Sequence, residues 1–184
     1  MRVRARTWLA ASAVLLTAGC ASEREPVALP PPAPIALDVP AASSGGACRL
    51  LDFAVIEQHV NVRFDVAAAS ERGDTHTCVV RAGQATLPEL TLTVTETSMD
   101  KATFAADVVP DSAGKVTGLG QQAYRRTTGA AGGHGPAAEV GWLSTDGRLA
   151  TLRWTTPKGT ARSAAEKLVA GLTALAKTVN TRAL

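Results

Sequence analysis

The chain has 184 residues, enough for one folded domain and an extension, and its 19 basic and 16 acidic side chains give a formal charge of +3. Three of the basic residues, Arg2, Arg4 and Arg6, precede every acid, so removal of that segment would leave 16 charges of each sign. The basic excess therefore belongs to the N-terminal segment, and the composition gives no reason to expect nucleic-acid binding.

The first 20 residues have the layout of an export signal. The arginines form a positive start, and residues 8–19 form an uncharged stretch. At ~1.5 Å per residue this stretch is too short for a hydrocarbon core of ~30 Å. The ending Leu-Thr-Ala-Gly-Cys at 16–20 resembles the bacterial lipoprotein box. This resemblance implies a signal peptide over 1–19, acyl chains such as palmitate on a diacylglyceryl group at Cys20, and anchorage to the outer face of the cell membrane. A plain signal peptide with an incidental cysteine is the alternative.

Residues 20–47 are expected to be a lipidated cysteine followed by a disordered, Pro-rich tether. Proline removes backbone donors and favours extended conformations, so no packed element is predicted there. Recognition by a proline-binding partner is the alternative. Six of the ten prolines lie in this segment: Pro26, Pro30, Pro31, Pro32, Pro34 and Pro40.

Residues 48–184 are predicted to form a single α+β domain. The elements, in chain order, begin with a helix over 52–60 that Asp52 would cap. Strands follow over 75–82 and over 89–97, where apolar residues alternate with threonines. A helix over 98–108, capped by Ser98, precedes a glycine turn and another strand.

The C-terminal part is predicted to be a hairpin over 138–156 and a helix over 163–180. Ser163 and Glu166 form a capping box, and apolar residues spaced by three and four give that helix one apolar stripe. Strands that run between two terminal helices favour a mainly antiparallel sheet, flanked by an N-terminal helix and a long C-terminal helix.

The hairpin contains Asp146-Gly147, a preferred two-residue turn. A turn of that length would place Leu143, Ala150, Leu152 and Trp154 on one face, and Val140, Trp142 and Leu149 on the other. If helices cover one face, a tryptophan stands on the open side. We therefore expect Trp142 or Trp154, with the loop over 129–135 and its His134, to border a binding surface. The alternatives are that both faces are covered, or that a longer loop shifts the register.

Two cysteines remain if the lipid takes Cys20. Export favours a Cys48–Cys78 disulfide, and closing a loop of about 31 residues would stabilise the fold by roughly 3.5–4 kcal/mol in the chain-entropy model. Two buried free thiols are the alternative.

The predicted domain at 48–184, taken with the segments that precede it, resembles a known family. The lipobox, the tether, "CRLLD" at 48–52, the second cysteine in "CVV" and "GLGQQAY" at 118–124 together resemble the small actinobacterial lipoproteins of the LprB/LprC type, whose function is unknown. The resemblance implies a cell-envelope lipoprotein and carries over no catalytic residue.

Catalytic patterns are weak. "GLGQQA" at 118–123 lacks the strand and helix of a dinucleotide site, and the glycine-rich stretch at 127–138 lacks a P-loop ending. The three histidines, His59, His76 and His134, show no zinc spacing. We therefore expect no cofactor, no metal and no enzyme activity. The expected function is a non-catalytic module that binds an envelope protein or a small ligand. A carrier of an apolar molecule or lipid in a helix–sheet cleft is the alternative, and a weakly acting hydrolase ranks third.

Overall fold

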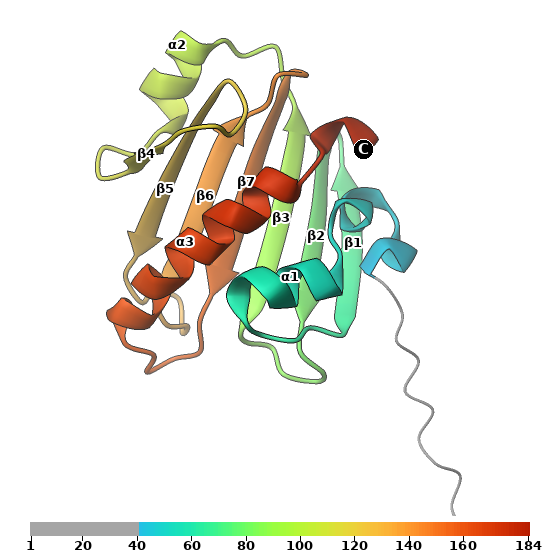
Figure 1. The fold of residues 1–184 in the computed structure, drawn as a ribbon, viewed down its shortest axis with the longest axis vertical. Coiled ribbons are helices and arrows are strands. Elements are labelled where there is room, and N and C mark those ends of the chain that lie inside the picture. The colour runs from blue at the N-terminus through green and yellow to red at the C-terminus, as the bar shows by residue number, and fades with distance from the viewer. Residues whose placement is uncertain (1–40) are drawn as a thin grey trace, which may run out of the picture. The chain divides into compact units, whose positions relative to one another are not determined.

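Seven antiparallel strands form the central sheet, as the computed structural model, which describes residues 41–184, shows (Figure 1). The described residues belong to one compact unit. The predicted α+β class, with its antiparallel sheet and long C-terminal helix, is confirmed. In spatial order the strands are β1 (Val66–Arg72), β2 (Thr75–Arg81), β3 (Glu89–Glu96), β7 (Arg148–Thr155), β6 (Ala137–Leu143), β5 (Gln122–Thr128) and β4 (Gly114–Val116).

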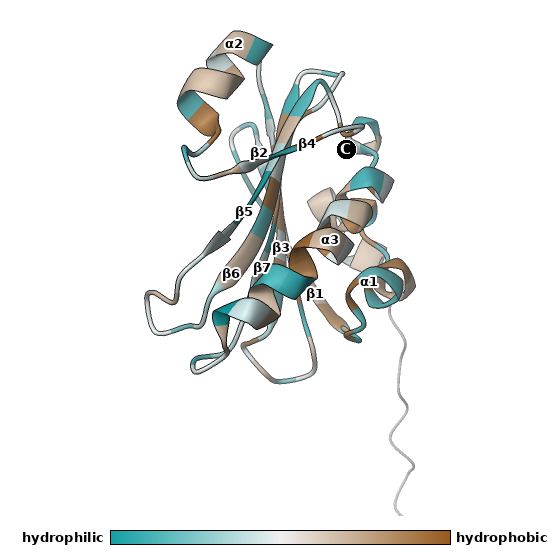
Figure 2. Ribbon diagram, turned by 60° about the vertical axis from the view of Figure 1, so that its left-hand side comes forward, coloured by the Kyte–Doolittle hydropathy of each residue, from teal (hydrophilic) through white to brown (hydrophobic). Residues whose placement is uncertain are grey.

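Two helices, α1 (Phe53–Val60) and α3 (Arg162–Thr178), lie on the same face of the sheet (Figures 1 and 2). The Asp52 carboxylate caps α1 as predicted, because it accepts hydrogen bonds from the backbone N–H groups of Ala54 (2.8 Å) and Val55 (3.1 Å). Gly171 allows α3 to approach α1 closely, since a Cβ there would lie 2.1 Å from the carbonyl oxygen of His59. No helix among residues 41–184 is both long and apolar enough to cross a membrane.

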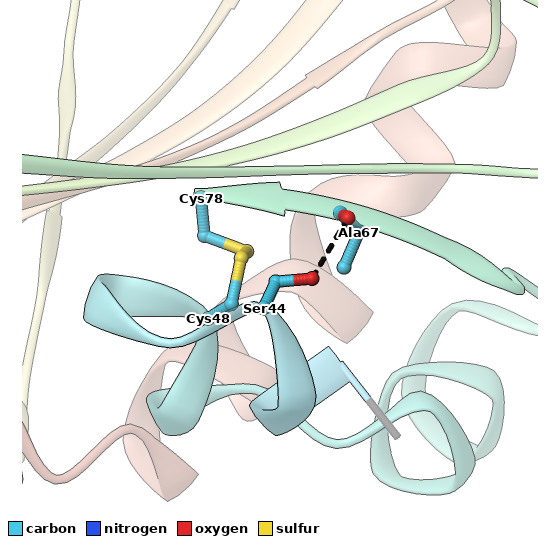
Figure 3. Close-up of a disulfide and its surroundings, with 4 residues drawn as sticks. All are labelled: Ser44, Cys48, Ala67 and Cys78. Atoms are coloured by element: carbon cyan, nitrogen blue, oxygen red, sulfur yellow. Dashed lines mark hydrogen bonds between the residues drawn. A yellow bond between two sulfur atoms is a disulfide. The ribbon is translucent and has the colours of Figure 1, made fainter. Parts of the chain in front are cut away.

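A disulfide joins Cys48 to Cys78 and confirms the predicted pair (Figure 3). Cys48 lies in the 3-10 turn η2 (Gly46–Leu50), which packs on β1 and β2, and the preceding turn η1 (Ala41–Ser44) packs on β1. Ser44 Oγ also donates to the carbonyl oxygen of Ala67 (2.8 Å). The packed domain therefore begins before residue 48, and residues 41–47 differ from the predicted tether because the disulfide and β1 hold them.

Strand β3 has the predicted alternation. Leu90, Leu92 and Val94 are buried under the helices, and the intervening threonines face the other side of the sheet. Strand β1 was not predicted, since its sequence Val-Ala-Ala-Ala-Ser-Glu-Arg has no apolar alternation; it is an exposed edge strand.

The β6–β7 hairpin corrects the predicted two-residue turn. Ser144 N donates to Arg148 O (2.8 Å), and Arg148 N donates to Ser144 Oγ (3.0 Å), so residues 145–147 form a three-residue loop. Gly147 takes its left-handed position (φ 76°). The register shifts by one residue, which exchanges the two faces of one strand relative to the other. Val140, Trp142, Ala150, Leu152 and Trp154 now share the helix-covered face.

Two helix starts also differ from the prediction. The helix expected from Ser98 is the short α2 (Lys101–Thr103), which Asp100 caps, and it continues into the π-helical turn η3 (Phe104–Val108). Helix α3 begins at Arg162 without a side-chain cap, because its N-cap residue is Ala161, whose methyl group accepts no hydrogen bond. Ser163 lies inside the helix, and Glu166 pairs with Arg162 (3.1 Å) instead of closing the predicted capping box. Phe104 packs with Tyr124 and Leu143, so α2 and η3 cover one end of the sheet face opposite to α1 and α3 (Figure 2).

Candidate functional site

The sheet face opposite to α1 and α3 carries a row of threonines and a cluster of charged side chains. Outside the end under α2 and η3, no helix of residues 41–184 covers it (Figure 2). We call it the open face. Its central rows are fixed by the strand registers: Thr77 faces Thr93, which faces Thr151, and in the next row Thr91 faces Arg153.

The threonines of the open face differ in whether their hydroxyl groups are used. Thr75 and Thr95 share a hydrogen bond of 3.0 Å, and Thr91 donates to Glu89 (3.1 Å). Among the described residues, the hydroxyl groups of Thr77, Thr93 and Thr151 make no hydrogen bond; they remain available to a binding partner.

A buried carboxylate stands at one side of this face. Glu139 on β6 accepts hydrogen bonds from Tyr124 O–H (2.9 Å), Arg126 Nε (2.7 Å) and Arg153 Nη1 (2.8 Å). Its side chain is 5% exposed, whereas those of Arg126 and Arg153 are 30% and 32% exposed. Tyr124 reaches Glu139 because its ring lies over Gly141, where a Cβ would come within 2.4 Å of the ring.

The electrostatics of this cluster favour an ionised Glu139. Burial by itself raises the pKa of Glu139, but the hydrogen bonds from Arg126, Arg153 and Tyr124 outweigh burial and hold that pKa below its usual value. Burial, and then the negative charge of Glu139, raise the pKa of Tyr124 to about 12. One carboxylate thus holds two guanidinium groups, which leaves one surplus positive charge and unused N–H donors at the open face.

Sequence reasoning did not assign this cluster to a site. The sequence shows Glu139 as a single acidic residue without evident partners, because it cannot show which residues the neighbouring strands place opposite it. A usable signal was the charged residue inside the otherwise apolar Ala-Ala-Glu-Val-Gly-Trp-Leu at 137–143. An acid that interrupts such a stretch must find partners on adjacent strands.

The expected binding residues do not form an exposed surface. Trp142 and Trp154 are each 2% exposed and face the helices, so the expected open tryptophan face is not found; the corrected hairpin register explains why. Trp154 packs edge-on against Phe64, with 5.2 Å between the ring centroids. His134 lies in the loop between β5 and β6, and its Nδ1 is 2.9 Å from the carbonyl oxygen of Gly135. The structure does not bring the three residues together.

Two hollows open at the margins of the space between helices and sheet, one of about 330 Å³ between α3 and β5 and one of about 340 Å³ at the C-terminal end of α3. The centre of that space, where a carrier would need a cleft, is filled by side chains. Leu152, Leu172 and Leu175 meet there and are 0–1% exposed. The glycines of "GLGQQA" form the turn between β4 and β5, and a strand follows them. Within residues 41–184, no group of three His, Cys, Asp or Glu side chains is arranged to hold a metal ion.

Comparisons with known proteins add no relative: no family model, no curated protein and no solved structure matches this chain. Cys20, the predicted signal peptide over 1–19 and the proline residues of the tether lie outside the described residues.

Proposed function

We propose that this protein is a lipid-anchored envelope protein whose folded domain is a non-catalytic module that binds an acidic protein partner through its open face. The observation that carries this proposal is the cluster around Glu139. Its two arginines exceed the one acid that they neutralise, and they lie beside threonine hydroxyl groups without hydrogen-bond partners.

The charge of the open face favours carboxylates in the partner. The two acids that the described strands place on the open face are already engaged, Glu89 by Arg81 and Glu139 by its two arginines. Arg126 uses Nε for Glu139, so its two Nη groups can donate to a carboxylate. A surface that offers hydrogen-bond donors and has no unpaired carboxylate complements an acidic partner. Such charge complementarity also raises the rate at which the two proteins associate.

A photo-crosslinking amino acid at Thr93 of the full chain in cells tests this proposal. Thr93 lies in the centre of the open face, and Lys167, on the exposed side of α3, is the control position. We expect one discrete adduct from Thr93, none from Lys167, and an acidic segment at the crosslinked position when mass spectrometry identifies the partner.

A substitution tests the role of the surplus charge. Arg126→Gln leaves Glu139 paired with Arg153 and should reduce the adduct several-fold, whereas Arg125→Gln, on the next residue and the other face, should not. An adduct with residues 21–40 of the same chain, with a second copy, or with a partner that lacks acidic residues would contradict the proposal, as would equal effects of the two substitutions.

The anchor rests on the sequence of residues 1–20. Attachment of at least two acyl chains at Cys20 would hold the protein stably on a membrane, where a single chain binds only marginally. Metabolic labelling with an alkyne fatty acid should mark the wild-type chain and the Thr17→Leu variant but not Cys20→Ser. Labelling that survives Cys20→Ser would show that this anchor is not at Cys20.

A further inference from the structure

A hollow lies at the C-terminal end of α3, away from the Glu139 cluster. Its volume is about 340 Å³, and it opens to solvent between the turn at 118–120, the β6–β7 loop and residues 177–182. Trp142 lies at its floor. A second hollow of about 400 Å³ shares residues 118–120, so this turn separates the two.

The two hollows are basic. Lys177 and Arg182 line the first, and Lys101 and Lys115 line the second. None of these four side chains has an acidic partner among the described residues, whereas Arg81, Arg126, Arg148, Arg153 and Arg162 all have one. Four cations without counter-charges around one turn form a local positive field.

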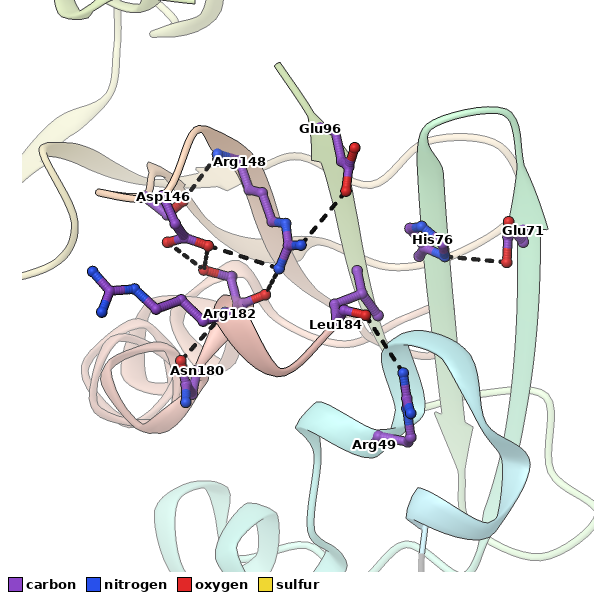
Figure 4. Close-up of polar contacts among 11 residues, drawn as sticks. Arg49, Glu71, His76, Glu96, Asp146, Arg148, Asn180, Arg182 and Leu184 are labelled. Atoms are coloured by element: carbon purple, nitrogen blue, oxygen red, sulfur yellow. Dashed lines mark hydrogen bonds and ion pairs between the residues drawn. The ribbon is translucent and has the colours of Figure 1, made fainter. Parts of the chain in front are cut away.

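The single acid in the lining of the first hollow is already engaged. Asp146 accepts the hydroxyl group of Thr181 at 3.1 and 3.2 Å and lies 3.7 Å from Arg148 Nη1 (Figure 4). Arg148 also donates to the carbonyl oxygen of Thr181. Arg182 forms no ion pair with Asp146; its nearest side-chain partner is Thr145 Oγ1 at 3.5 Å. Asp146 therefore fastens η4 (Thr181–Ala183) to the hairpin and leaves Arg182 uncompensated.

The turn at 118–120, which forms one wall of the hollow, is fixed in place. A Cβ on Gly120 would lie 2.3 Å from the carbonyl oxygen of Leu143, so the turn is pressed against the end of β6. Gln121 holds it there through N–H to Leu143 O (2.7 Å) and Nε2 to Ser144 O (2.9 Å). A Cβ on Gly118 would lie 3.7 Å from Lys177 Nζ, which places that ammonium group directly over the turn.

The C-terminus of a helix carries a partial negative charge, which opposes an anion. In α3 the last turn reduces this effect, because Thr178 Oγ1 donates to Leu175 O (2.8 Å), Val179 N donates to Ala176 O (3.3 Å), and Lys177 supplies a full positive charge. Cations, the Asn180 amide and the Thr145 hydroxyl group then surround the hollow with several donors, which suits an anion with several acceptor oxygens.

We propose that this basic hollow is a binding site for a phosphate-bearing ligand, either a free phosphate compound or a phosphodiester headgroup. Lys177 and Arg182 hold the anion, and the turn at 118–120 forms a rigid wall beside it. This inference is independent of the open face and of the acidic partner proposed for it.

Calorimetric titration of the full chain in a neutral detergent tests the site with two probes, inorganic pyrophosphate and glycerophosphoglycerol. The test variant is Lys177→Gln with Arg182→Gln. The matched control is Lys158→Gln with Arg72→Gln, which removes the same charges from exposed residues elsewhere in the domain.

We expect the test variant to bind at least tenfold more weakly than wild type and the control to change binding less than twofold. Pyrophosphate binding without glycerophosphoglycerol binding identifies a free phosphate compound, and the reverse identifies a headgroup. If neither probe binds, or if both variants weaken binding equally because only bulk charge matters, the proposal is wrong.

Discussion

The two faces of the sheet use the same strands in opposite ways. Along β3, the residues under the helices are leucine and valine with no exposure, and their neighbours in the chain are threonines with partly exposed side chains. The helix-covered face contributes most of the apolar burial, at ~25 cal/mol per Å². On the open face, Glu139 is the one buried charged residue among residues 41–184; two arginines neutralise it and Tyr124 donates a hydrogen bond to it. The difference indicates that substitutions on the covered face change stability, whereas most of the open face can change binding without unfolding the domain.

A large effect is expected from the crosslink that fastens η2 to the covered face. Replacement of both Cys48 and Cys78 by alanine is expected to lower the free energy of unfolding by up to about 3.5–4 kcal/mol. The reason is that the unfolded chain regains the conformational entropy that the disulfide removes by closing a loop between residues 30 positions apart. Urea denaturation followed by tryptophan fluorescence measures this change, and Ser43→Ala, at an exposed position nearby, is the control. A loss below about 1 kcal/mol would show that packing alone holds η2.

Two adjacent residues of β7 compare the faces directly. Leu152→Ala removes a fully buried side chain and is expected to cost about 2–5 kcal/mol of unfolding free energy. Thr151→Val keeps the β-branched shape of a side chain on the open face, and it should change the free energy of unfolding by about 0.5 kcal/mol or less. The same denaturation experiment serves both variants. Comparable losses would mean that something covers the open face.

Glu139 is the expected exception on the open face. Glu139→Gln leaves two arginines without their carboxylate and should cost about 1–3 kcal/mol, less than for a fully buried pair because both guanidinium groups are partly solvated. Since the pKa of Glu139 is lowered on folding, its contribution is present above the usual value near 4.5 and is lost as the pH falls through the folded pKa.

Acid denaturation should therefore be shallower for Glu139→Gln than for wild type. Glu57→Gln, on the exposed side of α1, should change the free energy of unfolding by no more than about 0.5 kcal/mol. Identical acid profiles for wild type and Glu139→Gln would refute the assigned role of the carboxylate.

The smallest effect concerns Tyr124. Tyr124→Phe keeps the ring over Gly141 and removes one donor to Glu139, at a cost of about 1 kcal/mol. Because folding raises the pKa of Tyr124 to about 12, its contribution is complete below the unfolded value near 10 and is lost as the pH rises through about 12. Tyr124 is the only tyrosine of the chain, so its absorbance near 295 nm reports this directly. Ionisation of the folded protein near pH 10 would contradict the buried hydrogen bond.

The sequence by itself determined several local features. Asp52 caps α1 because a short acidic side chain reaches the free N–H groups of the first turn, and β3 forms because its apolar residues recur at every second position. Oxidising export and an even number of remaining cysteines were enough to predict the Cys48–Cys78 pair. These features depend on residues close in the chain or on simple counting.

Tertiary structure decided the rest. The hairpin register depends on which face must bury Trp142 and Trp154 together, and one residue of shift moves every side chain to the opposite face. The cluster around Glu139 exists because β5, β6 and β7 place Arg126, Glu139 and Arg153 side by side, although 27 positions separate the two arginines in the sequence. Likewise, the basic hollow joins the turn at 118–120 to residues 177–182, and only the packing of α3 across the sheet brings these segments together.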